Sequence, residues 1–172
     1  VGEYAELLEN NASYQAFIVT EGIENPIDKA ALLIEILEYG KPVMCISYGA
    51  CILADSVGLS TEKTDRLVTG RIDTHLKDSV TGAIRDRHRR DFTIPMRGNE
   101  GKEIEIIGCD SQHREIHLFR PVKYPHCIGA VSQPEYTSRP YSPNLLFAHL
   151  LNLKIEEELQ DSAYESGTNS SC

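Results

Sequence analysis

The segment Ile46-Ser47-Tyr48-Gly49 stands where an apolar run of β-forming residues gives way to a helical pattern. So tight a join between strand and helix has the form of a nucleophile elbow, in which the residue at the strand end is thrust out beneath the next helix. Ser47 would take that strained position, and Gly49 supplies a small neighbour. Cys45, on the other side, stands where a second glycine would be accommodated more easily. Alone, the pattern is a weak signal of catalysis.

A second polar segment, residues 129–140, follows the apolar run Cys127-Ile-Gly-Ala-Val131. Its sequence, Gly-Ala-Val-Ser-Gln-Pro-Glu-Tyr-Thr-Ser-Arg-Pro, predicts a strand that runs out into a proline-bounded loop. Glutaminase domains of CTP synthases carry Gly-Val-Gln-(Phe/Tyr)-His-Pro-Glu-Phe-x-Ser-Arg-Pro at the corresponding point. The chain is similar to that motif at Gly129, Pro134, Glu135, Tyr136, Ser138, Arg139 and Pro140.

Other segments resemble the same family in the same order. The run from Pro42 to Gly49 is similar to Pro-(Phe/Tyr)-Leu-Gly-Ile-Cys-Leu-Gly, residues 60–62 to Ser-Thr-Glu, and residues 86–89 to the start of Glu-Arg-His-Arg-His-Arg-Tyr. The resemblance covers roughly residues 10 to 155. It implies the α/β fold of class I glutamine amidotransferases, which is flavodoxin-like: three layers, with a mainly parallel central sheet and helices on both faces.

The family's reaction, as the resemblance implies it, uses a Cys-His-Glu triad to release ammonia from glutamine. By position, the nucleophile falls on Ser47, the base on Gln133 and the orienting carboxylate on Glu135. A serine hydroxyl needs an adjacent base, and a carboxamide takes up no proton near neutral pH. Because loss of triad members removes about 10⁴ to 10⁶ in rate, we expect negligible glutaminase activity.

The groups that would support catalysis also depart from the family pattern. The resemblance places the oxyanion hole at Gly22 and Tyr48. The loop that contains Gly22 carries Glu21 where the family has a glycine. A carboxylate beside a site that must stabilise negative charge works against the chemistry.

The resemblance also assigns the residues that would hold the substrate. Glu62 matches the acidic residue that meets the glutamine amino group, and Cys51 replaces the glutamine that follows the elbow. The arginine that holds the glutamine carboxylate falls on Asp91, although a slip of one residue would bring Arg90 there. Glutamine or a related small molecule is the expected ligand, and its binding is in doubt.

We therefore predict a catalytically degenerate domain that acts as a binding or regulatory module, with a CTP synthase or another synthetase-type protein as partner. The rival hypothesis is a hydrolase or amidotransferase of altered chemistry that uses Ser47 with a base from elsewhere. Cys51 is a conceivable displaced nucleophile, and His88 and His126 are conceivable substitute bases; structural roles are favoured for all three. A third possibility is that the sequence derives from a complete CTP synthase-like polypeptide.

Alternating apolar segments define the elements that must position these residues. Strands are predicted over Tyr14–Thr20 and Lys41–Ser47, and a helix runs from the cap Asn25-Pro26 to Gly40. Ala50–Val57 is the next predicted helix. Strand and helix in alternation imply a parallel sheet. Shorter strands, including antiparallel ones, are predicted at 92–96, 103–108, 115–119 and 127–131, and a last helix follows Ser142-Pro143, with Leu145, Leu146, Leu150 and Leu153.

Bulk properties limit the remaining possibilities. We expect one domain over residues 1–159 and a disordered tail over 160–172. The net charge of −9 disfavours nucleic acid and anionic membrane as partners, and the Arg-rich stretch 85–97 is interpreted as a solvated loop.

The five cysteines show no metal-ligand spacing and are expected as free thiols, and no phosphate-binding loop is present, so neither metal nor cofactor is expected. No secretory signal or membrane span is recognised, so a cytoplasmic protein is predicted.

Overall fold

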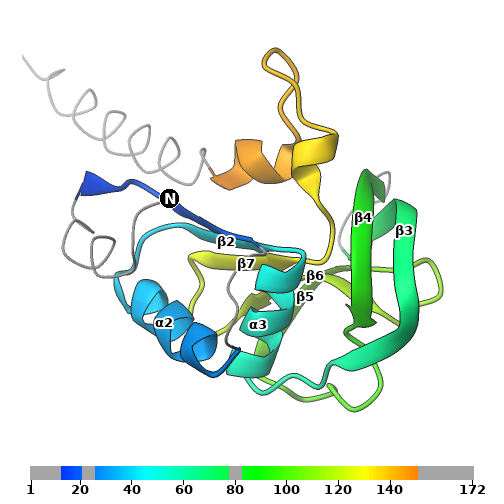
Figure 1. The fold of residues 1–172 in the computed structure, drawn as a ribbon, viewed down its shortest axis with the longest axis horizontal. Helices are drawn as coiled ribbons and strands as arrows, with labels where there is room; N and C mark the ends of the chain where they lie inside the picture. The colour runs from blue at the N-terminus through cyan, green and yellow to red at the C-terminus, as the bar shows by residue number, and fades with distance from the viewer. Residues whose placement is uncertain (1–12, 21–25, 78–82, 151–172) are drawn as a thin grey trace, which may run out of the picture.

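The computed structural model describes residues 13–20, 26–77 and 83–150. Its strands form one seven-stranded sheet in the order β1-β2-β7-β6-β5-β3-β4. Helices pack against this sheet, and a long hairpin projects at one end of it (Figure 1). The α/β class with helices on both faces, predicted above, is confirmed.

The parallel part of the sheet consists of β1 (Phe17–Val19), β2 (Val43–Ile46) and β7 (Cys127–Ala130). Every residue of β2 and β7 is buried, as expected for apolar runs covered on both faces. β1 is an edge strand and is shorter than the predicted Tyr14–Thr20. Its central residue Ile18 is half exposed, so this strand is not covered on both faces.

Two helices cover one face of the parallel strands, and the last helix covers the other. α2 (Pro26–Glu38) and α3 (Tyr48–Ser56) pack on the face that carries Val43 and Cys45, and residues 145–150 are helical and pack on the face that carries Met44 and Ile46. Alternate residues of β2 thus enter different cores, which is the basis of the three layers. The predicted helix from Pro26 to Gly40 is confirmed, with Gly40 ending it at φ 68°.

The other half of the sheet is antiparallel. It is built from β6 (Ile116–Pro121), β5 (Ile104–Cys109), β3 (Glu62–Leu76) and β4 (Ala83–Thr93). Among the described strands, four of the six neighbouring pairs are antiparallel, a larger share than predicted. β3 and β4 extend beyond the body of the sheet as the hairpin at the right of Figure 1.

This hairpin corrects the interpretation of the Arg-rich stretch as a solvated loop. Residues 85–93 lie in β4, which ends at Thr93, so only the first two residues of the predicted strand at 92–96 belong to it. β3 was not predicted at all, because most of its side chains are exposed and show no alternation of apolar and polar residues. Pairing with β4 provides its regular structure.

Several predicted features fall outside the described residues: Gly22, Leu153, the cap residue Asn25 and the tail over 160–172. Within the three described ranges, no helix is long and apolar enough to cross a membrane.

Candidate functional site

The elbow expected at the end of β2 is present. Ser47 adopts φ 54° and ψ −121°, a conformation that L-residues rarely occupy, and only 2% of its surface is exposed. Its N–H donates to the Ala130 carbonyl of β7 (2.9 Å), while its own carbonyl accepts from the N–H groups of Ala50 (3.0 Å) and Cys51 (3.3 Å). Backbone strain of this kind costs about 1–3 kcal/mol and persists where surrounding bonds impose it.

The neighbours of Ser47 show how the sequence permits this turn. A Cβ atom built on Gly49 would lie 2.2 Å from the Val19 carbonyl oxygen, so only glycine lets α3 approach β1 this closely. Cys45, expected to fit less well than glycine, is fully buried opposite Gly129 of β7. A hydrogen bond with Cys127 and burial raise the pKa of the Cys45 thiol well above its ordinary value, so Cys45 is a structural, protonated thiol.

Gln133 lies near the elbow because β2 and β7 are parallel neighbours. Ile46 pairs with Ala130, so the residues that follow the two strands emerge at the same sheet edge. Gln133 is 6% exposed, and its Oε1 is buried with no hydrogen-bond partner among the described residues. Its N–H donates to the Arg87 carbonyl of β4 (2.8 Å), which ties this loop to the hairpin.

Glu135, the third residue of the position-matched triad, lies on the 3-10 helix η2 (Pro134–Tyr136). In contrast to Ser47 and Gln133, it is exposed. The nucleophile and base positions are therefore both buried, after two neighbouring parallel strands, and the carboxylate position lies at the surface. Tyr48, placed at the oxyanion hole by the resemblance, opens α3 directly after Ser47.

The register of β4 resolves whether Asp91 or Arg90 faces the elbow. The Tyr48 hydroxyl donates to the Asp91 carboxylate, and the Tyr48 ring lies 5.5 Å from that of Phe92. Arg90 is 5% exposed and is held by Glu115 (Nη2 to Oε2, 2.7 Å). Of the two side chains, the one that contacts Tyr48 beside the elbow is therefore Asp91, while the Arg90 guanidinium is bound by Glu115. An acidic group stands where the resemblance expects an arginine.

Cys51 and Glu62 border the same region of α3. Thr61, the residue before Glu62, donates from Oγ1 to Asp55 Oδ1 (2.9 Å), which brings the start of β3 against this helix. Glu62 itself is exposed. Burial, with a further contribution from Asp55, raises the pKa of the Cys51 thiol to about 11. Burial thus disfavours the thiolate form of Cys51, which argues against its use as a displaced nucleophile.

The two histidines considered as substitute bases have other partners. His126 Nε2 lies 2.9 Å from the Leu37 carbonyl at the end of α2. His88 lies in β4, and its Nδ1 accepts a hydrogen bond from Arg90 Nε (3.1 Å). Structural roles explain both contacts. Within the described part of the chain, no group of three or more His, Cys, Asp or Glu side chains could hold a metal ion.

One feature of the surface was not predicted from the sequence. Two adjoining hollows lie along the β3–β4 hairpin and the loop that follows Gln133, and each is lined by three arginines. The arginines were recognised in the sequence, but the hollows depend on the pairing of β3 with β4, which was not predicted.

Known proteins share this fold, although no family model matches the sequence. A protein from Thermoplasma acidophilum that is assigned as part of a GMP synthase is similar in structure, with a TM-score of 0.66 at 15% identity, over 92% of this chain and 80% of that one. The glutaminase domain of Trypanosoma brucei CTPS, solved with bound acivicin, is similar with a TM-score of 0.70 at 13% identity, over 86% and 74%.

A glutamine amidotransferase from Thermotoga maritima gives a TM-score of 0.57 at 14% identity, over 88% of this chain and 66% of that one. At these identities the comparison concerns the fold. The chain has the fold of class I glutamine amidotransferase domains, and the glutaminase domain of Trypanosoma brucei CTPS is among its structural neighbours.

Proposed function

We propose that this chain is a glutaminase-like domain that has lost glutamine hydrolysis and acts as a binding or regulatory module linked to CTP synthesis. The observation that carries the proposal is the position of Ser47 and Gln133, each of which follows one of two neighbouring parallel strands. Ser47 occupies the nucleophile position, and Gln133 follows the neighbouring parallel strand where the base would stand.

A carboxamide cannot accept the proton that a serine hydroxyl must lose in order to attack an amide. The thiol of a working enzyme is partly ionised at neutral pH, with a pKa of about 8.5, and depends less on its base. Replacement of both groups therefore removes the nucleophile and the means of activating it. The covalent step of glutamine hydrolysis is lost.

The charge beside the elbow supports the same conclusion about binding. A free glutamine presents a carboxylate, and the Asp91 side chain at this place would repel it. Arg90, which could otherwise bind that carboxylate, is buried and bound by Glu115. Weak or absent binding of free glutamine is the expected result.

Ammonia release from glutamine tests this proposal. The wild-type chain should be indistinguishable from Ser47→Ala, and calorimetry should detect no glutamine binding. The double reversion Ser47→Cys, Gln133→His should stay inactive until Asp91→Arg is added, because the carboxylate needs a cation. Wild-type ammonia release that disappears in Ser47→Ala would refute the loss of activity.

The regulatory role requires a partner, for which a CTP synthase is the leading candidate. Its support is the CTPS glutaminase domain among the structural neighbours together with the sequence motifs described above. Co-elution of the two purified proteins, with CTP formation measured at increasing amounts of this chain, would test it. A separate profile for each protein, with unchanged CTP formation, would count against the partner and leave the loss of hydrolysis untouched.

One observation favours the rival function, a hydrolase that uses Ser47. The strained backbone of Ser47 is kept although glycine would adopt φ 54° without cost. Retained strain is typical of functional sites. Covalent labelling by a fluorophosphonate, lost in Ser47→Ala, would establish this second function and overturn the first.

A further inference from the structure

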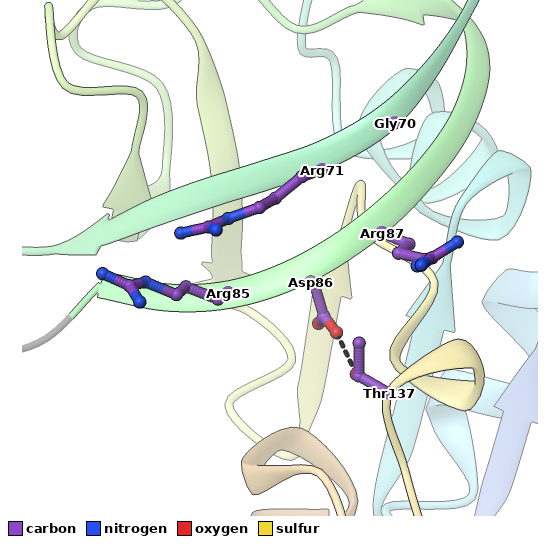
Figure 2. Close-up of a pocket in the computed structure, with 6 residues that line it drawn as sticks. All are labelled: Gly70, Arg71, Arg85, Asp86, Arg87 and Thr137. Atoms are coloured by element: carbon purple, nitrogen blue, oxygen red, sulfur yellow. Dashed lines mark hydrogen bonds between the residues drawn. The ribbon is translucent and has the colours of Figure 1, made fainter.

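The arginine-lined hollows along the hairpin form a feature that the proposed function does not use. The smaller, of about 380 Å³, is lined by Gly70, Arg71, Arg85, Asp86, Arg87 and Thr137. The larger, of about 590 Å³, is lined by Thr69, Gly70, Arg87, His88, Arg89, Tyr136 and Arg139. Gly70 and Arg87 belong to both, so the two are continuous. Figure 2 shows Arg71, Arg85 and Arg87 around the smaller hollow.

Positive charge is concentrated here in an acidic chain. Five of the 17 basic residues line the two hollows, while the net charge of the whole chain is −9. An unpaired cluster of like charges destabilises the folded state by self-repulsion. Such a cluster is therefore expected to have a counter-charge, either from the protein or from a ligand.

The protein neutralises only the smaller hollow. Asp73 lies 3.0 Å from Arg71 and 3.9 Å from Arg85. Asp86 lines the hollow but is occupied on the protein side, because it accepts hydrogen bonds from Ser132 (3.0 Å), Asn144 (2.9 Å) and Thr137, the last drawn in Figure 2. Asp86 forms no ion pair with an arginine among the described residues.

The larger hollow has no such compensation. Arg87, Arg89 and Arg139 line it, no carboxylate does, and none of these three arginines forms an ion pair with another described residue. Arg139 donates to the Ser138 carbonyl (2.8 Å), which steadies its guanidinium at the rim. Arg87 and Arg89 alternate along β4 and so project from the same face of the strand.

His88, which lies between Arg87 and Arg89 on β4, also contributes to the lining of the larger hollow. Its Nδ1 accepts from Arg90 Nε, so the ring proton of the neutral imidazole resides on Nε2. Burial and the nearby Arg90 charge lower the pKa of His88, which keeps the ring neutral at pH 7. Arg90 is in turn held by Glu115 at 2.7 Å, so the support beneath His88 is charge-balanced.

We propose that the larger hollow binds a phosphate-bearing small molecule through Arg87, Arg89 and Arg139. Guanidinium groups match phosphate oxygens with paired hydrogen bonds, which ammonium groups cannot do. The volume exceeds what one inorganic phosphate needs, so a phosphate ester or a pyrophosphate group is the fitting class. Tyr136, half exposed at the edge, offers a ring against which the remainder of such a molecule can pack.

The bound molecule would act on the elbow through the backbone. The Arg87 carbonyl accepts the Gln133 N–H, and Tyr136 and Arg139 belong to the loop that continues from Gln133. A ligand that bridges Arg87 and Arg139 clamps this loop to β4. It thereby fixes the residue that stands at the base position.

Isothermal titration of the full chain with inorganic pyrophosphate, at about 50 mM and about 200 mM salt, tests the site. Arg87→Ala with Arg89→Ala should weaken binding at least tenfold. Arg87→Lys keeps the charge and should weaken binding less, with circular dichroism reporting on the fold of each variant. Arg114→Ala is the matched control, because it removes an exposed arginine of the β5–β6 turn that is paired with Asp110; it should bind as wild type.

Three results would overturn the proposal. The first is no heat and no rise in melting temperature with pyrophosphate at the lower salt concentration. The second is equal weakening by Arg114→Ala, which would show non-specific attraction. The third is tighter binding of a single-stranded RNA oligonucleotide with the same arginine dependence, which would make the hollow part of a nucleic-acid surface.

Discussion

Gly49→Ala is the most direct test of the geometry of the elbow. The added methyl carbon would lie 2.2 Å from the Val19 carbonyl oxygen and 2.8 Å from its carbonyl carbon. Both atoms are backbone, and β1 is hydrogen-bonded to β2, so neither can rotate away as a side chain would. Relief requires α3 and β1 to separate by about 1 Å at a fully packed boundary.

The expected cost follows from two opposing effects. Overpacking of a well-packed region costs typically about 1–3 kcal/mol, and a clash with fixed backbone belongs at the upper end. Alanine is a better helix former than glycine by about 1 kcal/mol, so without the clash the substitution would stabilise α3. The net expectation is a loss of about 2 kcal/mol, which for a domain of this size lowers the melting temperature by about 4–8 °C.

Urea unfolding followed by circular dichroism measures this loss. The urea concentration at the midpoint should fall, while the dependence of the free energy of unfolding on urea concentration stays the same. Gly98→Ala is the matched control, since nothing lies within 4 Å of its added Cβ and only its φ of 87° opposes the change; it should cost about 1 kcal/mol. An unchanged or raised midpoint for Gly49→Ala would refute the close approach of α3 to β1 and, with it, the elbow.

Three further results are expected. Ser47→Gly should raise stability by about 1 kcal/mol, because glycine adopts the positive φ freely; a loss above that size in thermal unfolding would contradict the strain. His117 and Arg90 hold the pKa of Glu115 at about 2, below its ordinary 4.5, so its contribution is complete above pH 4.5 and is lost as the pH falls toward 2. Glu115→Gln should therefore reduce the change in the free energy of unfolding between pH 4.5 and pH 2. The same pH dependence as in the wild type would refute the ion pair. With its pKa at about 11, Cys51 should be alkylated by iodoacetamide at pH 8 at least tenfold more slowly in the folded chain than in urea, as followed by mass spectrometry; equal rates would restore it as a candidate nucleophile.

Local signals in the sequence were sufficient for the parallel half of the fold. Pro26 and Gly40 mark the ends of α2, because proline suits a first helical turn and glycine a left-handed end. The apolar run of β2, followed at once by Ser47 and Gly49, predicted the elbow. These elements are specified by residues close together in the chain.

The hairpin could not be predicted in the same way. β3 has fifteen residues, most of them exposed, so burial imposed no alternation that a sequence pattern could register. Its structure comes from backbone pairing with β4, a contact between segments separated in the chain. The same pairing turned a presumed loop of arginines into an ordered strand with hollows beside it.

Some chemical properties of the site follow from the sequence, and others follow only from the tertiary structure. Residue types alone established that Gln133 cannot serve as a base and that Ser47 is not a thiol, because these properties belong to the side chains. Only the tertiary structure decided that Asp91 contacts Tyr48 beside the elbow while Arg90 is bound by Glu115, since these contacts join segments far apart in the chain. It likewise decided that Cys51 is held protonated, because burial is a property of the packed chain.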